Sequence, residues 1–215
     1  MVNGCKTLTP VVVVDLDGTL VDVNTFREYI LFVTKQLLKQ GKLLAAAKVI
    51  TAVALRKTRF ISHSEMKKRI LVATRKIMTN DNLDLLTRRL LGRLNVDVFD
   101  KLERYRADGY LVLLATAAPE IYARPLAEAL RFDSCVATSD VAPDNEAWNE
   151  NVGEVKLASV RDYVSSVEGH ISVVMTDHYD DLPLMRYNTG MNILVNPSEK
   201  TVSAISRHGI VFTIM

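Results

Sequence analysis

The chain has 215 residues, of which 48% are hydrophobic, 24% charged and 7% aromatic, and its formal net charge is +2 at pH 7. This composition is ordinary for a globular protein and excludes a collagen-like or intrinsically disordered chain. The length allows one domain, or one domain with a sizeable insertion. The two cysteines match no zinc-binding spacing and no secretory signal precedes the first apolar run, so we expect a soluble, cytoplasmic protein.

The first predicted strand is the run of four valines at 11–14. A long helical segment is expected next, because residues 22–100 contain no proline and only two glycines. In this segment we predict a bundle of about four helices, of which the stretch 43–55 is apolar on nearly all sides and is expected to pack inside the bundle. The apolar residues at helical spacing form three stripes: Phe26, Tyr29, Ile30, Val33 and Leu37; Met66, Ile70, Ala73 and Ile77; and Leu83, Leu86, Leu90 and Leu94.

The rest of the chain alternates short apolar runs with helical patterns, and fully apolar strands separated by helices are typical of a parallel sheet covered on both faces. We therefore predict an α/β fold of three layers, with a core at 1–20 and 101–215 and an all-helical domain inserted at 21–100. The predicted strands are 111–114, 171–175 and 192–195, the predicted helices lie near 119–131, 154–166, 180–188 and 198–207, and 139–152 is a surface excursion.

Ligands of such sheets bind at the carboxyl ends of the strands. Asp15 and Asp17 leave the first strand within the sequence DLDGT, and Thr116 follows the second strand. Taken singly, the two aspartates could be turn residues and the threonine an ordinary helix cap. In the functional interpretation, one carboxylate is a nucleophile, and Thr116 binds an anion together with the backbone N–H groups that follow it.

Two further features point to the same edge of the sheet. The strand at 171–175 ends in TDHYDD, which contains Asp177 and Asp181, and Lys156 begins a helix, where a lysine opposes the helix dipole. Clustered carboxylates repel by roughly 4 kcal/mol a pair at an effective dielectric of about 20, so the cluster needs a cation or some of its members must stay protonated. If a cation is bound, an all-oxygen set favours Mg²⁺ over zinc. A carboxylate nucleophile, a metal, a lysine and a bound anion together indicate phosphoryl transfer; helix capping and a solvated lysine are the alternatives.

Four motifs occur in the order and at the spacing of the haloacid dehalogenase superfamily, which the chain resembles: the DxDGT sequence from Asp15 to Thr19, Thr116, Lys156, and the DxxxD sequence from Asp177 to Asp181. The helical insertion resembles the C1-type cap of the phosphoserine-phosphatase-like branch. The resemblance implies a Rossmann-like core with a helical cap and a Mg²⁺-dependent phosphatase. The acid at Asp17 favours a phosphatase over a dehalogenase.

The resemblance also implies roles for these residues. Asp15 would attack phosphorus and form an aspartyl-phosphate, and Asp17 would protonate the leaving group and then activate water. Thr116, the Ala117 amide and Lys156 would hold the phosphoryl oxygens.

The metal site implied by the resemblance is formed by four aspartates. The carboxylates of Asp15 and Asp177 and the main-chain carbonyl of Asp17 would bind Mg²⁺. Asp181 would orient the metal's ligand shell or Lys156.

The substrate is less well defined. Phosphoserine phosphatases carry a glutamate nine residues after the nucleophile, where this chain has Asn24, which argues against phosphoserine itself. His178 is a second candidate for contact with the substrate. We expect a small anionic phosphorylated substrate and no nucleic-acid partner. A lipid-phosphate phosphatase of the phosphatidylglycerophosphate type and a phosphate-binding protein without catalysis remain alternatives, and the oligomeric state is open.

The insertion is strongly basic. Residues 22–100 carry 16 lysines and arginines and 7 acidic residues, whereas the remainder is acidic. A basic cap could draw an anionic substrate toward the site, or its charges could simply form a solvated face, as we expect for the basic run 67–69. The stretch 43–55, flanked by Lys42 and Arg56, could alternatively form an apolar surface for a lipid phosphate or a membrane.

Overall fold

The computed structural model describes residues 8–140 and 148–215. Cys5 and part of the predicted excursion at 139–152 lie outside the described residues. None of the helices in the described part of the chain combines the length and the hydropathy that crossing a bilayer requires.

A six-stranded parallel sheet forms the centre of the described molecule, with the strand order β3-β2-β1-β4-β5-β6. β1 lies between β2 and β4, so the residues that follow these three strands meet at one edge of the sheet. The strands are β1 (Thr9–Val14), β2 (Leu111–Pro119), β3 (Ser134–Thr138), β4 (Gly169–Thr176), β5 (Met191–Leu194) and β6 (Thr213–Ile214).

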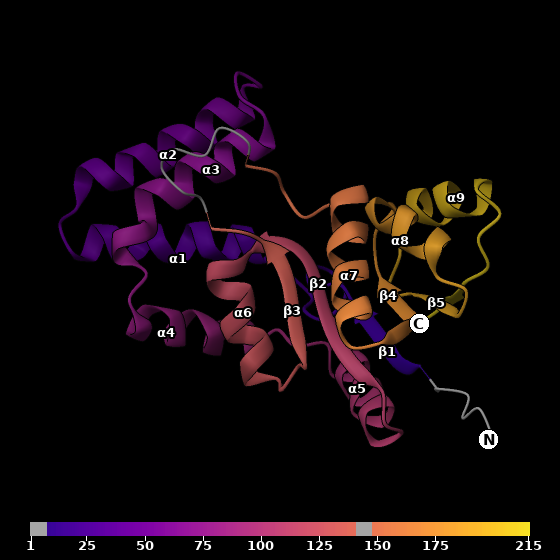
Figure 1. Ribbon diagram of the computed structural model, residues 1–215. Helices are drawn as coiled ribbons and strands as arrows, with labels where there is room; N and C mark the ends of the chain where they lie inside the picture. Colours follow the sequence, from indigo (N-terminus) through magenta and orange to yellow (C-terminus); the bar gives the residue numbers. More distant parts are fainter. Residues whose placement is uncertain (1–7, 141–147) are drawn as a thin grey trace, which may run out of the picture.

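Both faces of the sheet are covered by helices (Figure 1). Val12 and Val14 of β1 belong to the buried cluster that includes α5 (Val96–Ala107) and α6 (Glu120–Ala129). Val11 and Val13 point to the opposite face and join a second cluster, because successive side chains of a strand alternate between faces. That second cluster contains side chains of α7 (Glu154–Ser166), α8 (Leu182–Tyr187) and α9 (Glu199–Arg207). The predicted three-layer α/β fold is confirmed.

The predicted helical bundle follows β1 and lies to one side of the sheet in Figure 1. Asn24 begins its first helix, where the side chain accepts a hydrogen bond from the N–H of Arg27, and Ser62 caps the third in the same way with Glu65. The helices are α1 (Thr25–Lys39), α2 (Leu43–Lys57), α3 (His63–Thr74) and α4 (Asn80–Leu91), with one short 3₁₀ turn, Arg75–Ile77, after α3.

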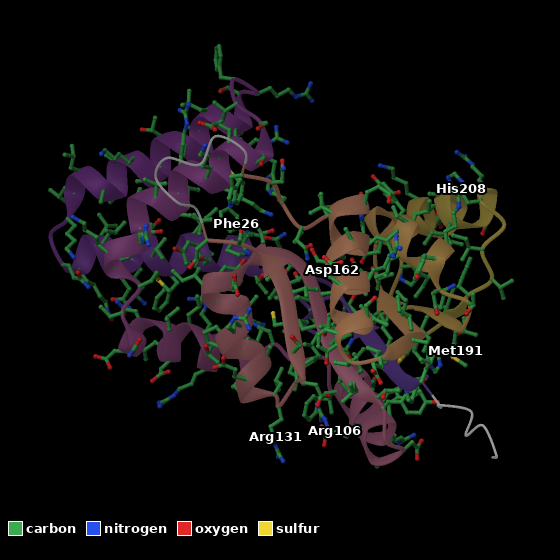
Figure 2. The ribbon with its side chains drawn as sticks, viewed as in Figure 1. Phe26, Arg106, Arg131, Asp162, Met191 and His208 are labelled. Carbon is green, nitrogen blue, oxygen red and sulfur yellow. The ribbon has the colours of Figure 1, made fainter. Side chains whose placement is uncertain are left out.

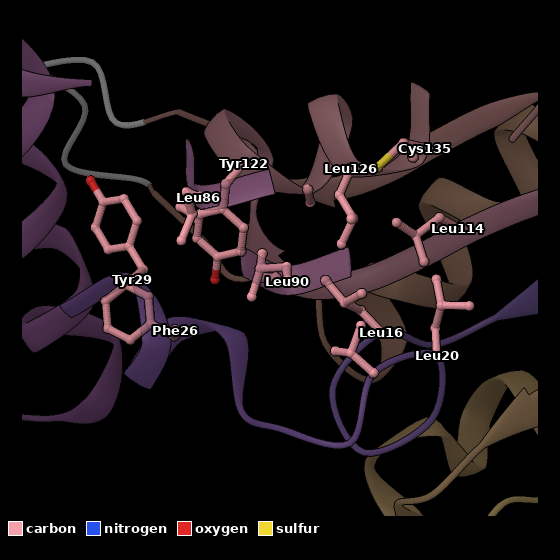
Figure 3. Close-up of a cluster of buried hydrophobic side chains, with 14 of the residues drawn as sticks. Leu16, Leu20, Phe26, Tyr29, Leu86, Leu90, Leu114, Tyr122, Leu126 and Cys135 are labelled. Carbon is pink, nitrogen blue, oxygen red and sulfur yellow. The ribbon is translucent and has the colours of Figure 1, made fainter. Parts of the chain in front are cut away.

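The bundle and the sheet share one hydrophobic core. Leu16 and Leu20, from the segment after β1, belong to the same buried cluster as Leu86 and Leu90 of α4 and Tyr122 of α6, and Figure 3 draws these side chains. The Tyr122 ring also stacks on Tyr29 of α1, with 5.3 Å between ring centroids. This continuous packing fixes the bundle against the carboxyl edge of the sheet.

The predicted boundary between residues 100 and 101 falls inside α5. Val98 and Leu102 of this helix are fully buried in the cluster that covers the sheet, so α5 is part of the core layer. We therefore propose that the inserted domain ends between α4 and α5, near 92–95; the division into two domains stays a prediction.

The expectation that the stretch 43–55 packs inside the bundle is wrong. Only Ala46, Val49 and Ala52 of α2 are buried, while Leu43 and Leu44 are 66% and 77% exposed. The physical reason is that α2 packs mainly against α1 and α3 in the described part of the chain, and its buried residues lie on one face of the helix.

Two other features differ from the sequence prediction. β2 continues to Pro119, so Thr116 lies within the strand and not after it. β3 and β6 are not predicted, because these short edge strands have only one neighbour each and carry no long apolar run.

Candidate active site

The loop after β1 brings Asp15 and Asp177 to the same place. The N–H of Asp15 donates a hydrogen bond to the Met175 carbonyl at 2.9 Å, which ties the end of β1 to β4. Gly18 has φ +76°, and a Cβ atom there would collide with the carboxylate of Asp177. The turn in DxDGT therefore requires a glycine, both for its left-handed backbone and for the close approach of Asp177.

Asp17 is held by the start of α1. Its Oδ1 accepts a hydrogen bond from the N–H of Thr25 at 2.9 Å. Burial raises the pKa of Asp17, although the hydrogen bonds from Thr25 act in the opposite direction. A raised pKa favours the protonated carboxyl, which is the form that a general acid needs.

Lys156 joins the first and fourth motifs. It is 3% exposed, and its Nζ lies 2.9 Å from Asp15 Oδ1 and 2.6 Å from Asp181 Oδ1. The other oxygen of Asp181 accepts a hydrogen bond from Thr176 Oγ1 at 2.8 Å. Burial alone would lower the pKa of Lys156, but Asp15 and Asp181 hold it above its usual value, so the lysine stays charged. Asp181 thus contacts Lys156, one of the two partners expected for it.

The carboxyls of Asp15 and Asp177 fit a hard cation. Burial raises the pKa of Asp15 to about 7, although Lys156 lowers it, and burial raises the pKa of Asp177 to about 6. Thr19 Oγ1 donates to Asp177 at 3.5 Å. The described residues contain no cluster of three or more acidic, histidine or cysteine side chains that could hold a metal. A site here would therefore combine two carboxylates with a main-chain carbonyl, a donor set of oxygens that suits Mg²⁺.

The end of β2 forms the other side of the site. The buried hydroxyl of Thr116 accepts a hydrogen bond from the N–H of Ala118 at 3.0 Å. Thr138 Oγ1 donates to the carbonyl of Ala117 at 2.8 Å, and Asn151 Nδ2 donates to the carbonyl of Thr116 at 3.1 Å. Sequence reasoning missed Thr138 and Asn151, which fix the backbone of Thr116 and Ala117.

Sequence reasoning also missed Lys67 of α3. Lys67 is 5% exposed, donates to the Ala117 carbonyl at 3.2 Å and forms an ion pair with Glu150. The expectation that the basic run 67–69 faces water is therefore wrong for Lys67. Spacing could have revealed it, because Lys67 lies three and four residues before the buried Ile70 and Leu71 of the same helix face.

The predicted site residues line one cavity of about 270 Å³. Asn24 lies there while its side chain caps α1, and His178 lies there with its ring against Tyr179, 4.1 Å between centroids. All nine side chains or backbone positions singled out from the sequence are included, and Val152 and Asp180 are additional. The lining residues are Asp15, Asp17, Asn24, Thr116, Ala117, Val152, Lys156, Asp177, His178, Asp180 and Asp181.

The fold is an α/β core that carries paired aspartates at the end of its first strand, Asp15 and Asp17. The profile of the haloacid dehalogenase-like hydrolases matches residues 12–186, and the chain belongs to this family. The predicted haloacid dehalogenase superfamily is confirmed, and with it the prediction of a hydrolase.

No curated protein sequence matches the chain. Several solved structures share its fold. A protein of unknown function from Bordetella pertussis Tohama I is 18% identical, with a TM-score of 0.78 and coverage of 96% of this chain and 99% of that chain. A HAD family hydrolase from Salmonella enterica serovar Typhi is 14% identical, with a TM-score of 0.64 and coverage of 96% and 68%. A probable phosphoserine phosphatase from Vibrio cholerae is 12% identical, with a TM-score of 0.65 and coverage of 91% and 58%.

Proposed function

We propose that the protein is a Mg²⁺-dependent phosphatase that hydrolyses a small phosphomonoester through an aspartyl-phosphate on Asp15. The observation that carries this proposal is the convergence of Asp15, Lys156 and Thr116, from three distant parts of the chain, on one cavity. Asp15 has the position of a nucleophile, and Lys156 supplies a fixed positive charge 2.9 Å from it.

The reaction proceeds in two displacements. In the first, a carboxylate oxygen of Asp15 bonds to phosphorus as the ester oxygen leaves, and Asp17 gives that oxygen its proton. In the second, a water molecule attacks the phosphorus of the aspartyl-phosphate and passes its proton to Asp17, which releases phosphate and restores both carboxyls. Lys156, the Thr116 hydroxyl and the Ala117 amide bind the phosphoryl oxygens during both displacements.

The carboxylates of Asp15 and Asp177 and the main-chain carbonyl of Asp17 would hold the Mg²⁺. When bound, the ion supplies positive charge that offsets the buried carboxylates and the phosphoryl oxygens. Asp181 keeps Lys156 in place through their contact at 2.6 Å.

The cavity favours a small substrate. Its volume of about 270 Å³ lies below the range of about 300–1,000 Å³ that is typical of ligand pockets. Asn24, a neutral side chain already used to cap α1, stands nine residues after Asp15, the spacing at which phosphoserine phosphatases carry a glutamate that meets the substrate amino group. A phosphate ester without that amino group therefore fits the cavity better than phosphoserine.

Turnover of p-nitrophenyl phosphate tests the proposal. We expect activity with Mg²⁺, loss of activity with EDTA, and a fall in kcat of roughly 10³-fold or more for Asp15→Asn. Asp162→Asn, at an exposed position of α7 labelled in Figure 2, is the matched control and should keep full activity. Undiminished turnover by Asp15→Asn would reject the covalent mechanism.

A further inference from the structure

Helix α2 separates two apolar grooves on the bundle, and Figure 1 shows it at the outer edge, away from α5. One groove, of about 1080 Å³, lies between α2 and α3, and the other, of about 600 Å³, lies between α1 and α2. We call their exposed large apolar residues the apolar cap surface. Its members, with exposed fractions from 50% to 77%, are Leu31, Leu38, Leu43, Leu44, Ile50 and Val72.

This distribution of apolar side chains is unusual for a helix on a protein surface. Such a helix normally buries its large apolar residues and exposes polar ones. In α2 the buried residues are the smaller Ala46, Val49 and Ala52, whereas Leu43 and Leu44 face outward. Scattered exposed leucines need no explanation, but a contiguous set marks an interaction surface.

Positive charge surrounds the apolar cap surface. Six lysines and one arginine line the two grooves, and the single acidic residue among the described lining residues, Glu65, is paired with Arg69 at 2.6 Å. Residues 25–77 as a whole contain thirteen lysines and arginines but only two acidic residues. The basic residues that line the grooves are Lys35, Lys39, Lys42, Lys48, Lys68, Arg69 and Lys76.

We propose that the apolar cap surface docks the protein on the headgroup region of an anionic lipid bilayer. A second copy of the chain would bring two sets of like charges together, which opposes self-association through this surface. A bilayer that contains anionic lipids matches both features: the leucines enter the boundary of the acyl chains, and the lysines extend along it and reach the phosphates. Docking does not depend on the reaction proposed for the cavity.

Co-sedimentation with lipid vesicles tests the docking. We expect the protein to pellet at low ionic strength with vesicles that contain about one third phosphatidylglycerol in phosphatidylcholine. Pelleting should be at least about tenfold weaker with phosphatidylcholine alone, and it should fall when salt shortens the screening length.

A pair of double variants tests the surface itself. Leu43→Asp/Leu44→Asp should weaken binding to the anionic vesicles at least about tenfold, since two exposed anchors are lost and two negative charges are added. Acidic residues are well tolerated in the first turn of a helix, and the circular dichroism spectrum should stay unchanged. The control is Val96→Asp/Val211→Asp, which makes the same kind of change at exposed positions outside the apolar cap surface. Val96 is 61% exposed and Val211 is 86% exposed. This variant should bind the vesicles as the unaltered protein does.

Three results would overturn the proposal. The first is a protein that pellets with neither kind of vesicle, and the second is a Leu43→Asp/Leu44→Asp variant that binds as well as the unaltered protein. The third is a dimer in analytical ultracentrifugation that this variant dissociates, which would assign the surface to a second copy of the chain.

Discussion

Lys156 and Lys67 are both buried at the candidate site, but their surroundings differ. Lys156 has two carboxylates, Asp15 and Asp181, within 2.9 Å. Lys67 has one carboxylate, Glu150, and the carbonyl of Ala117. A buried charge is costly unless it is paired, so each lysine must be explained by its partners. Lys67 comes from the bundle and contacts the phosphate-binding backbone, and we infer that it positions Ala117.

The variant Lys67→Met tests this positioning. We expect kcat/KM for p-nitrophenyl phosphate to fall roughly 10–100-fold, because a charged hydrogen bond contributes about 1.5–3 kcal/mol. Lys76→Met, which removes an exposed lysine from the same bundle, should leave kcat/KM unchanged. A lower melting temperature with unchanged kcat/KM for Lys67→Met would mean that the lysine is only structural.

At the scale of elements, the site depends on how the strand ends approach one another. The segment from Asp15 to Val21 turns back on itself, with the Gly18 N–H donating to the Val21 carbonyl at 2.8 Å. Gly18, in the loop after β1, lies next to Asp177, in the loop after β4. A side chain at Gly18 would therefore prevent the two loops from approaching each other.

Gly18→Ala should disrupt the close approach of the loop after β1 to Asp177. We expect kcat to fall at least about tenfold, because the new methyl group displaces the Asp177 carboxylate and strains the left-handed backbone. Gly41→Ala separates the two effects, since Gly41 has φ +66° but no atom within 4 Å of the added Cβ. Equal losses of activity in both variants would show that backbone strain alone, and not the approach of Asp177, is responsible.

The sequence predicted the elements that follow a strong local pattern. Apolar runs gave β1, β2, β4 and β5 near their observed positions, and α7 has the bounds that were expected. The short β3 has no such run, and its place is fixed by hydrogen bonds to β2. The four aspartates of the candidate site, Asp15, Asp17, Asp177 and Asp181, were recognisable because they follow the apolar runs of β1 and β4. The helical spacing of Lys67 indicates that it is buried, but its partner Ala117 and the partner of Asn151 could not be predicted, because both partners lie far away in the chain.

At the scale of the whole molecule, the bundle and the sheet are joined through one hydrophobic core. Leu86 of α4 is fully buried and lies close to Tyr122 of α6 in Figure 3, whereas its neighbour Leu85 is 49% exposed. This packing predicts that the bundle and the sheet unfold together.

Thermal unfolding of Leu86→Ala tests that cooperativity. We expect one transition, with the free energy of unfolding lowered by about 2–5 kcal/mol, because the substitution leaves a cavity in the shared core. Leu85→Ala, at the exposed neighbouring position, should change stability by less than about 1 kcal/mol. Two separate transitions, of which Leu86→Ala shifts only one, would show that the bundle is an independent folding unit.

The whole account depends on a covalent bond between Asp15 and phosphorus, and trapping that bond tests it most directly. The protein is mixed with a ³²P-labelled phosphomonoester and Mg²⁺, quenched in acid and digested, and the labelled peptide is sequenced. We predict label on the peptide that contains Asp15, and none in Asp15→Asn. Label on another residue, such as His178, or full turnover by Asp15→Asn would contradict the account.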